Sequence, residues 1–231
     1  WRKPSSAAFT RAETMHKSTL PPHTNRKAVP LNALLAWAEN LLLWSAFGAL
    51  PPLLGFLAGW WGSVFHVAEE NVIWYALGGL ALGVTADMLF LRGIVRAAYR
   101  LPWCVPMFVY LFYAVGMFGF FMGVPVFNVL LGALAGFYSG RRAHHSGLAA
   151  PQAERLSRLT ALFAAGVLAL ACTAALVLAA CSSSTPADIA GLLGLGFTPT
   201  MGAILGVSAV LGVILILGEY WLANKAFAIA K

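Results

Sequence analysis

Charge is what this 231-residue sequence has least of: charged residues make up 10% of it, whereas 60% of its residues are hydrophobic. A soluble domain carries roughly 25% charged residues and needs them to cover its surface. A disordered chain needs the opposite composition, with high charge and few apolar side chains. The scarcity of charge therefore excludes both classes and predicts an integral membrane protein that crosses the bilayer several times.

Catalytic and metal-binding motifs are also missing from the sequence. Its cysteines are Cys104, Cys172 and Cys181, and they lack metal-ligand spacing, so we expect no metal, cofactor or disulfide framework. Ser208 sits in a Gly-Val-Ser motif that has the short form of an intramembrane nucleophile, but no histidine follows it to activate the hydroxyl. An intramembrane enzyme is therefore the least favoured of the functions considered below.

Residues 1–30 differ from the rest of the chain. They are polar, contain Pro21, Pro22 and Pro30, and show no apolar period. We therefore expect a disordered basic tail over 1–30. Residues 31–231 are then expected to form a single transmembrane domain.

Six apolar segments follow the tail, each near the ~20 residues that a helix needs to cross a bilayer. The expected spans are 41–65, 72–91, 103–121, 124–140, 159–180 and 201–222. Pro51 and Pro52 should kink the first span, because two backbone amides are missing there. The predicted fold class is therefore all-α, a bundle of six transmembrane helices.

The stretch 103–140 is too long for one span and short for two. As one helix it would measure about 57 Å, nearly twice the ~30 Å thickness of the hydrocarbon core. Gly123, Val124 and Pro125 provide a break near its middle, and each half is then close to the minimum length of a span. The stretch is therefore either a tight hairpin of two spans or a re-entrant pair.

The placement of basic residues favours the hairpin. With six spans and a cytoplasmic N-terminus, the inner segments are 1–40, 92–102, 141–158 and 223–231, and they contain all 15 Lys and Arg residues. The outer loops contain none, as the positive-inside rule requires. A single span over 103–140 would put two arginine-containing loops on opposite faces. We therefore expect both termini to lie in the cytoplasm. The protein is expected in the inner membrane of a bacterial or archaeal cell.

The net charge of +7 is carried by residues that flank apolar runs. They belong to no motif that reads nucleic acid, so the expected partner is anionic lipid at the cytoplasmic face and not DNA or RNA. One group recurs at every fourth position over 92–100 and would form a stripe on a continuous helix. The residues expected to face lipid or a partner subunit are Arg92, Arg96, Arg100, Arg141 and Arg142.

Three carboxylates lie near the inner ends of apolar segments: Glu39, Asp87 and Glu219. A carboxylate within the hydrocarbon costs several kcal/mol unless it is paired, protonated or hydrated. Their similar expected depth allows two arrangements. Either they line a cavity that binds a cation, a proton or a solute, with Asp87 the deepest of them, or they pair with nearby arginines and fix helix packing.

The stretch 103–140 is rich in aromatic residues and contains one amide, Asn128. Tyr110 and Tyr113 place hydroxyls at membrane depth, where each needs a hydrogen-bond partner. These three side chains either converge on an aromatic-walled pocket or take part in ordinary helix packing.

Glycines four residues apart also predict close contacts between helices. The pairs are Gly79/Gly83, Gly132/Gly136, Gly136/Gly140 and Gly202/Gly206.

Turn signals fill the segment between the last two spans. Thr185, Pro186 and Asp188 have the spacing of a helix start with a capping box. Glycines at 194–196 are typical of a helix end. We therefore expect a short helix here, and a second start signal at Thr198 before the last span.

Three functions are consistent with these features. The first is a small-solute-binding or transport-related membrane subunit, acting alone or with a partner membrane subunit. The second is a structural or assembly subunit of a membrane complex, and the third is an intramembrane enzyme. A cavity would favour the first, a filled core with an exposed glycine stripe the second, and two convergent titratable groups the third.

Overall fold

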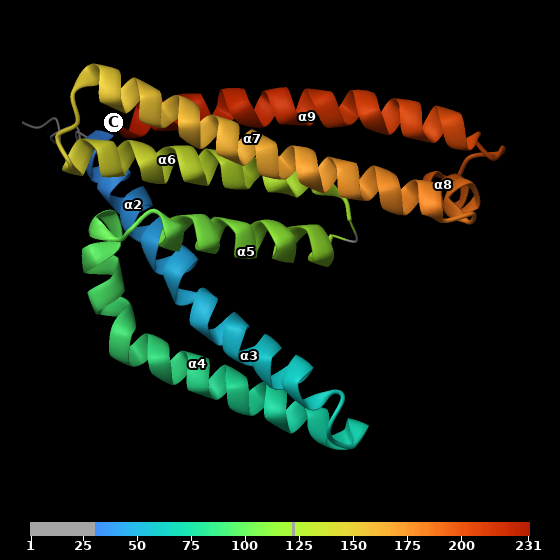
Figure 1. Ribbon diagram of the computed structural model, residues 1–231, viewed down its shortest axis with the longest axis horizontal. Coiled ribbons are helices and arrows are strands. Elements are labelled where there is room, and N and C mark those ends of the chain that lie inside the picture. The colour runs from blue at the N-terminus through green and yellow to red at the C-terminus, as the bar shows by residue number, and fades with distance from the viewer. Residues whose placement is uncertain (1–30, 122) are drawn as a thin grey trace, which may run out of the picture. The chain divides into compact units, whose positions relative to one another are not determined.

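The computed structural model describes residues 31–121 and 123–231, and this part of the chain is helical without strands (Figure 1). The α-helices are α2 (Leu31–Gly48), α3 (Leu50–Ser63), α4 (Glu69–Ala97), α5 (Cys104–Phe120), α6 (Val129–His145), α7 (Ala150–Cys181), α8 (Thr185–Leu193) and α9 (Met201–Ala230). Two 3₁₀ turns, η1 (Ala98–Arg100) and η2 (Pro125–Asn128), precede α5 and α6. The predicted all-α class is confirmed, and the predicted tail over 1–30 lies outside the described residues.

Four helical segments are long and apolar enough to cross a membrane. They are Ala33–Ser63, Glu69–Arg100, Ala150–Cys181 and Met201–Ala230. They correspond to the first, second, fifth and sixth spans predicted from the sequence. By length and composition the chain is therefore a multi-pass membrane protein with four candidate spans, while α5 and α6 are shorter helices of 17 residues each.

Both interruptions predicted from proline and glycine are present. The first apolar stretch breaks at Ala49, and α3 begins with Pro51 and Pro52 in its first turn. Backbone amides in the first turn of a helix have no acceptor within it, so proline loses no hydrogen bond there. The second break separates α5 from α6. There Gly123 adopts a φ of 81°, which a residue without a Cβ reaches at no steric cost, and Pro125 opens η2.

The short helix predicted before the last span is also present, as α8. It ends where Gly194 adopts a left-handed φ of 62°. Its cap position is Ser184, one residue before the expected one. The last helix begins after Thr200, whose hydroxyl oxygen accepts a hydrogen bond from the amide of Ala203 (3.3 Å). The start signal assigned to Thr198 was therefore two residues early.

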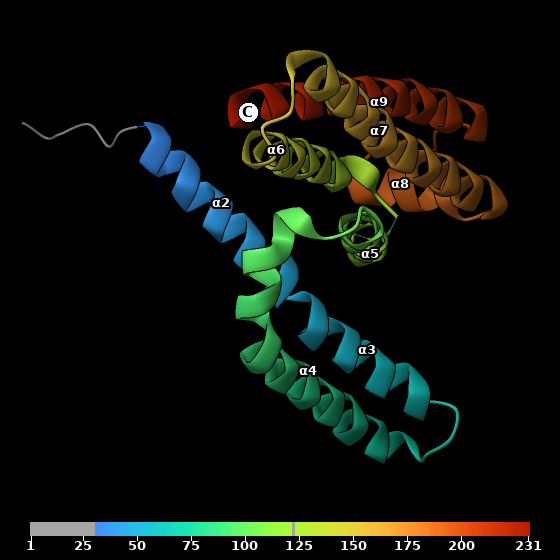
Figure 2. The ribbon, with the colours of Figure 1, turned by 60° about the vertical axis from the view of Figure 1, so that its left-hand side comes forward.

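Helices α3 and α4 form a hairpin whose backbones touch (Figures 1 and 2). A Cβ placed on Gly55 would overlap the carbonyl of Gly79, and a Cβ on Gly79 would overlap the carbonyl of Gly55. One turn along on each helix, Gly59 meets the backbone of Tyr75 and Gly83 meets that of Pro51. The pair Gly79/Gly83 thus packs within the chain, because only glycine permits this approach.

A second glycine seam joins α6 to α9, which lie side by side with α7 (Figure 2). Every fourth residue of α6 faces every fourth residue of α9: Gly132 lies on Glu219, Gly136 on Ala223 and Gly140 on Phe227. Gly202 and Gly206 behave differently, since a Cβ on either would meet nothing within 4 Å in the described part. The pairs Gly132/Gly136 and Gly136/Gly140 are therefore packing contacts, whereas the pair Gly202/Gly206 faces open surface.

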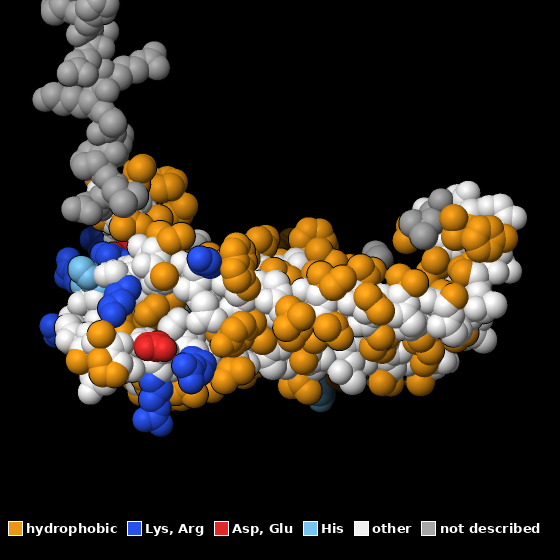
Figure 3. Space-filling model, turned by 90° about the horizontal axis from the view of Figure 1, so that it is seen from above, with side chains coloured by type: hydrophobic (Ala, Val, Ile, Leu, Met, Phe, Trp, Pro, Cys, Tyr) orange, Lys and Arg blue, Asp and Glu red, His pale blue; other side chains and the backbone are white. Residues whose placement is uncertain are grey.

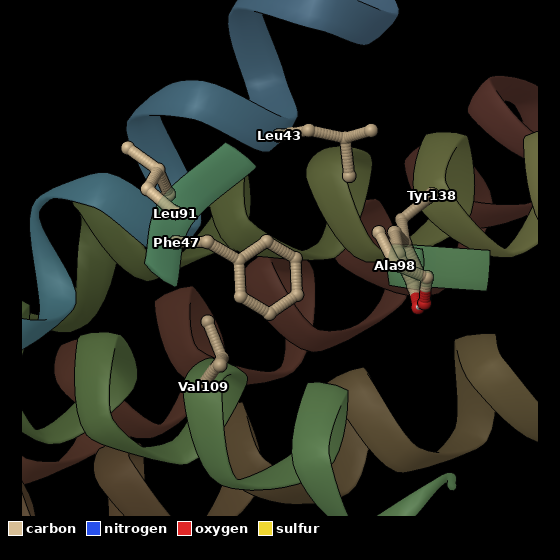
Figure 4. Close-up of a cluster of buried hydrophobic side chains, with 6 residues drawn as sticks. All are labelled: Leu43, Phe47, Leu91, Ala98, Val109 and Tyr138. Carbon is tan, nitrogen blue, oxygen red and sulfur yellow. Dashed lines mark hydrogen bonds between the residues drawn. The ribbon is translucent and has the colours of Figure 1, made fainter. Parts of the chain in front are cut away.

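A hydrophobic cluster joins α2, α4, α5 and α6 near one end of the helices (Figure 4). Its buried members are Leu43, Phe47, Leu91, Ala98, Val109 and Tyr138.

Lysine and arginine side chains gather at one end of the face in Figure 3, and hydrophobic side chains cover most of the remainder. Large apolar side chains such as those of Met88 and Phe120 are each 81% exposed. Their exposure would be unfavourable in water and is favourable in the hydrocarbon of a bilayer.

Candidate functional site

A cavity of about 700 Å³ lies among α2, α5, α6 and α7. Each of these helices contributes apolar walls, including Phe47 from α2, Met107 from α5, Ala135 from α6, and Leu159 and Phe163 from α7. The volume is in the range of small-molecule sites, which are usually concave and mostly apolar. Its lining therefore suits an apolar ligand better than a charged one.

Tyrosine hydroxyls at the cavity wall are already used by the protein. Tyr113 Oη donates to the carbonyl oxygen of Ala46 (2.9 Å), and Tyr138 Oη donates to the carbonyl oxygen of Ala98 (2.7 Å). The first bond ties α5 to α2, and the second ties α6 to the end of α4. Both rings are thus held in place against the cavity, and a ligand meets their apolar faces.

Tyr110, a third tyrosine of the wall, reaches the most deeply buried carboxyl group described. Its hydroxyl donates to Glu219 Oε1 (2.9 Å), and Glu219 is 0% exposed. The other oxygen, Oε2, has no hydrogen-bond partner among the described residues, nor does Glu219 form an ion pair with any of them. Its one side-chain donor is thus a neutral hydroxyl, with the backbone amide of Gly132 beside it, and the carboxyl group is completely removed from solvent.

Asn128 is buried as well, at 2% exposed, one turn before Gly132 along the chain. Its Nδ2 donates to the carbonyl oxygen of Ala114 (3.1 Å), while its Oδ1 has no partner in the described part of the chain. Ala114 is in turn one helical turn beyond Tyr110 on α5. Asn128 thus lies one layer away from the Tyr110–Glu219 bond and outside the residues that line the cavity.

Glu39 takes part in an ion pair at the end of α6. Arg141 Nε donates to its Oε2 (2.6 Å), and His145 Nε2 lies 2.8 Å from its Oε1. Arg141 and Gly132 are nine positions apart along α6, or about 13 Å. Since Glu39 pairs at the level of Arg141 and Glu219 packs at the level of Gly132, these two acids do not share one depth as the sequence suggested.

Asp87 lies apart from both glutamates, on α4. A Cβ added to Gly48 would come 3.8 Å from its Oδ2, so the carboxyl group faces the end of α2. Its Oδ1 is buried without a partner, and Asp87 makes no ion pair with any residue over 31–121 or 123–231. The structure therefore brings Tyr110 together with Glu219, places Tyr113 at the same cavity with Asp87 in its neighbourhood, and leaves Glu39 elsewhere.

The basic residues expected to face lipid divide into two groups. Arg92, Arg96 and Arg100 are exposed, although α4 ends at Ala97 and Arg100 belongs to the 3₁₀ turn that follows, so the stripe is not one continuous helix face. The other two arginines are partly buried by neighbouring side chains. Arg141 pairs with Glu39, and Arg142 places its guanidinium 4.0 Å from the ring centroid of Trp103.

Tyr138 and His145 were not among the predicted site residues. Tyr138 lines the cavity, and the ring of Tyr99 stacks between the two, 5.4 Å from Tyr138 and 4.7 Å from His145. The acceptor of Tyr138 is the carbonyl of Ala98, which lacks a helical donor because the residue four positions on, Pro102, has no amide hydrogen. The proline marks a free carbonyl in the sequence, but it does not say which side chain reaches it.

Comparison with protein-family models, with curated proteins and with solved structures finds no match to this chain. No residue role is therefore carried over from a relative. Among the described residues no three His, Cys, Asp or Glu side chains gather in a way that would hold a metal ion. The features with chemical content are the apolar cavity and the buried carboxyl group behind its wall.

Proposed function

We propose that this chain is a membrane subunit that binds an apolar small solute in the cavity among α2, α5, α6 and α7. The observation that carries the proposal is the cavity itself, with a volume of about 700 Å³ and walls of apolar and aromatic side chains. The wall hydroxyls of Tyr110, Tyr113 and Tyr138 already have protein partners. A strongly polar solute would lose its bonds to water there without replacement, whereas an apolar one would lose none.

We propose six spans, with α5 and α6 as the third and fourth and with both termini in the cytoplasm. Contacts bring basic helix ends together, since His144 Nδ1 lies 2.9 Å from the carbonyl oxygen of Lys231 and Tyr138 bonds to Ala98. Ends that meet at one membrane face are separated by an even number of spans or by a re-entrant pair, and the helix lengths favour two spans here. The α5 helix is about 25 Å long, and the stretch from Pro125 to His145 about 31 Å, close to a ~30 Å core.

We further propose that the exposed arginines of the α4 end contact anionic lipid head groups. Arg92, Arg96 and Arg100 are all exposed and follow an apolar helix directly. Each such charge near an anionic membrane surface contributes ~1 kcal/mol. A transport role for the subunit, alone or with a partner, would follow from release of the bound solute on one side of the membrane.

An assembly subunit is the second candidate, and one feature favours it. An open groove of about 660 Å³ runs along the α3–α4 hairpin and is lined by small residues such as Ala58 and Gly78. Small residues allow a helix of another chain to approach closely. The cavity among α2, α5, α6 and α7 is open on one side, where Met107, Leu134 and Leu159 are exposed. It favours the solute-binding function over this one, because four helices wall it, whereas two line the groove.

Filling the cavity tests the proposed function. We expect the apolar fluorophore N-phenylnaphthylamine to bind the purified protein saturably, and Ala135→Phe to weaken binding at least tenfold, or ~1.4 kcal/mol, because the new ring occupies the cavity. Ala209→Phe, on an exposed face of α9, is the matched control and should bind as the wild type does. Equal binding by the two variants, or no saturable binding by the wild type, would contradict a solute site in this cavity.

A further inference from the structure

The surroundings of Glu219 contain no basic group in the described part of the chain. From α5 the carboxyl group meets Tyr110, and from α6 it meets Gly132, which has no side chain to offer. From α7 the thiol of Cys172 lies close enough to interact with the carboxyl group. The arginines of α7, Arg155 and Arg158, are not buried, and Arg158 pairs with Glu154. Neither a tyrosine nor a cysteine supplies a positive charge to a carboxylate.

An ionised carboxylate in these surroundings would be held by neutral donors alone, the Tyr110 hydroxyl and the backbone amide of Gly132. The desolvation of such an ion costs more than hydrogen bonds from neutral donors return. A proton removes that cost, because the neutral carboxyl group still accepts from Tyr110 through Oε1 and carries hydrogen on Oε2, the oxygen without a partner. We infer that Glu219 is a proton-binding site in the interior of the helix bundle.

The next layer of the same helices holds a second unpaired acceptor. Asn128 Oδ1 is buried without a partner among described residues, one turn from Gly132 on the α6 side, and its amide nitrogen is fixed on Ala114, one turn from Tyr110. A protonated Oε2 is a donor that needs an acceptor, and Oδ1 is an acceptor that needs a donor. The two polar groups occupy successive turns, ~5 Å apart along the helix axis.

This proton site does not depend on what the cavity binds, since it rests only on the surroundings of Glu219. It does adjoin the cavity, because the ring of Tyr110 lines the wall while its hydroxyl holds Glu219. A structural hydrogen bond alone would be served by glutamine, whose side-chain oxygen also accepts from a tyrosine. What glutamate adds at this position is the ability to bind and release a proton.

Infrared difference spectra of the full chain in bilayers test the inference directly. A protonated carboxyl group has a C=O stretch that shifts when its hydrogen is exchanged for deuterium. We expect this band at neutral pH in the wild type, and we expect Glu219→Gln to remove a component of it that Asp87→Asn, the control for another acid at membrane depth, leaves in place. Absence of the band at neutral pH, an unchanged band in Glu219→Gln, or its removal by added Na⁺ would overturn the inference.

A second variant covers the case in which Glu219→Gln does not fold. Tyr110→Phe keeps the carboxyl group and removes its donor, so the C=O band should move to higher frequency without disappearing. An unshifted band in Tyr110→Phe would mean that the protonated group is another residue. The inference would then be wrong.

Discussion

Replacing Gly136 by leucine should remove the folded protein from membranes. The glycine lies on the backbone of Ala223, and a Cβ there would overlap the carbonyl of that residue. Overpacking a core costs ~1–3 kcal/mol where side chains can shift, and more where they cannot. Here the obstacle is the backbone of a 30-residue helix, so we expect a loss of at least ~3 kcal/mol. Cellular abundance and thermal unfolding in detergent measure it.

Gly206→Leu is the matched control for this experiment. Gly206 belongs to a glycine pair of the same spacing on α9, but a Cβ there would meet nothing within 4 Å in the described part. Its replacement adds the same side chain to an open surface, so abundance and unfolding temperature should stay close to those of the wild type. If both variants are tolerated equally, the α6–α9 seam is not packed as described.

Arg141→Met is expected to destabilise the protein by about 2 kcal/mol or more. The substitution removes the arginine from Glu39 and leaves His145 as its ion-pair partner among the described residues, although the Glu39 side chain is only 12% exposed. Breaking an exposed ion pair costs ~0–1 kcal/mol and breaking a buried one ~3–5 kcal/mol, and this pair lies between the two. The loss should appear as a lower unfolding temperature in detergent.

Two further variants separate the ion pair from the loss of a long side chain. Arg158→Met breaks the pair of Arg158 with Glu154, whose side chains are 65% and 76% exposed, and it should have almost no effect. Glu39→Gln combined with Arg141→Met should recover part of the loss, because no unpaired carboxylate then remains. An equal effect of Arg141→Met and Arg158→Met would contradict the assigned burial of the Glu39 pair.

The course of the chain was largely predictable because its breaks depend on local chemistry. Prolines at 51 and 52 and the glycine at 123 interrupt helices whatever they pack against, and both interruptions occur where expected. Helix ends were less predictable. The last predicted span stops at Leu222, whereas α9 continues to Ala230, and this last part packs on neighbouring helices: Asn224 accepts a hydrogen bond from Ser157 on α7 (2.8 Å) and Phe227 lies on Gly140 of α6. A tertiary contact of this kind leaves no trace in hydropathy.

The candidate site was predicted only as a set of residue types. Hydroxyls and carboxyls at membrane depth need partners, which is why Tyr110 and Glu219 were singled out. That they meet depends on how α5 and α9 are rotated about their axes. The glycine seam with α6 turns Glu219 of α9 inward, whereas no pattern in the sequence marks the rotation of α5. Glu39 illustrates the same point, since a pairing with arginine was foreseen but its contact with His145 was not.

Accessibility of the turn between α5 and α6 is the most direct test of the six-span bundle. In a background without the native cysteines, Val124→Cys, Ser183→Cys and Ser146→Cys provide one exposed thiol each. With six spans, an impermeant thiol reagent should label intact cells at positions 124 and 183, and at position 146 only after the membrane is opened. Labelling of positions 124 and 146 from the same side would contradict the account, because α5 and α6 would then form a re-entrant pair.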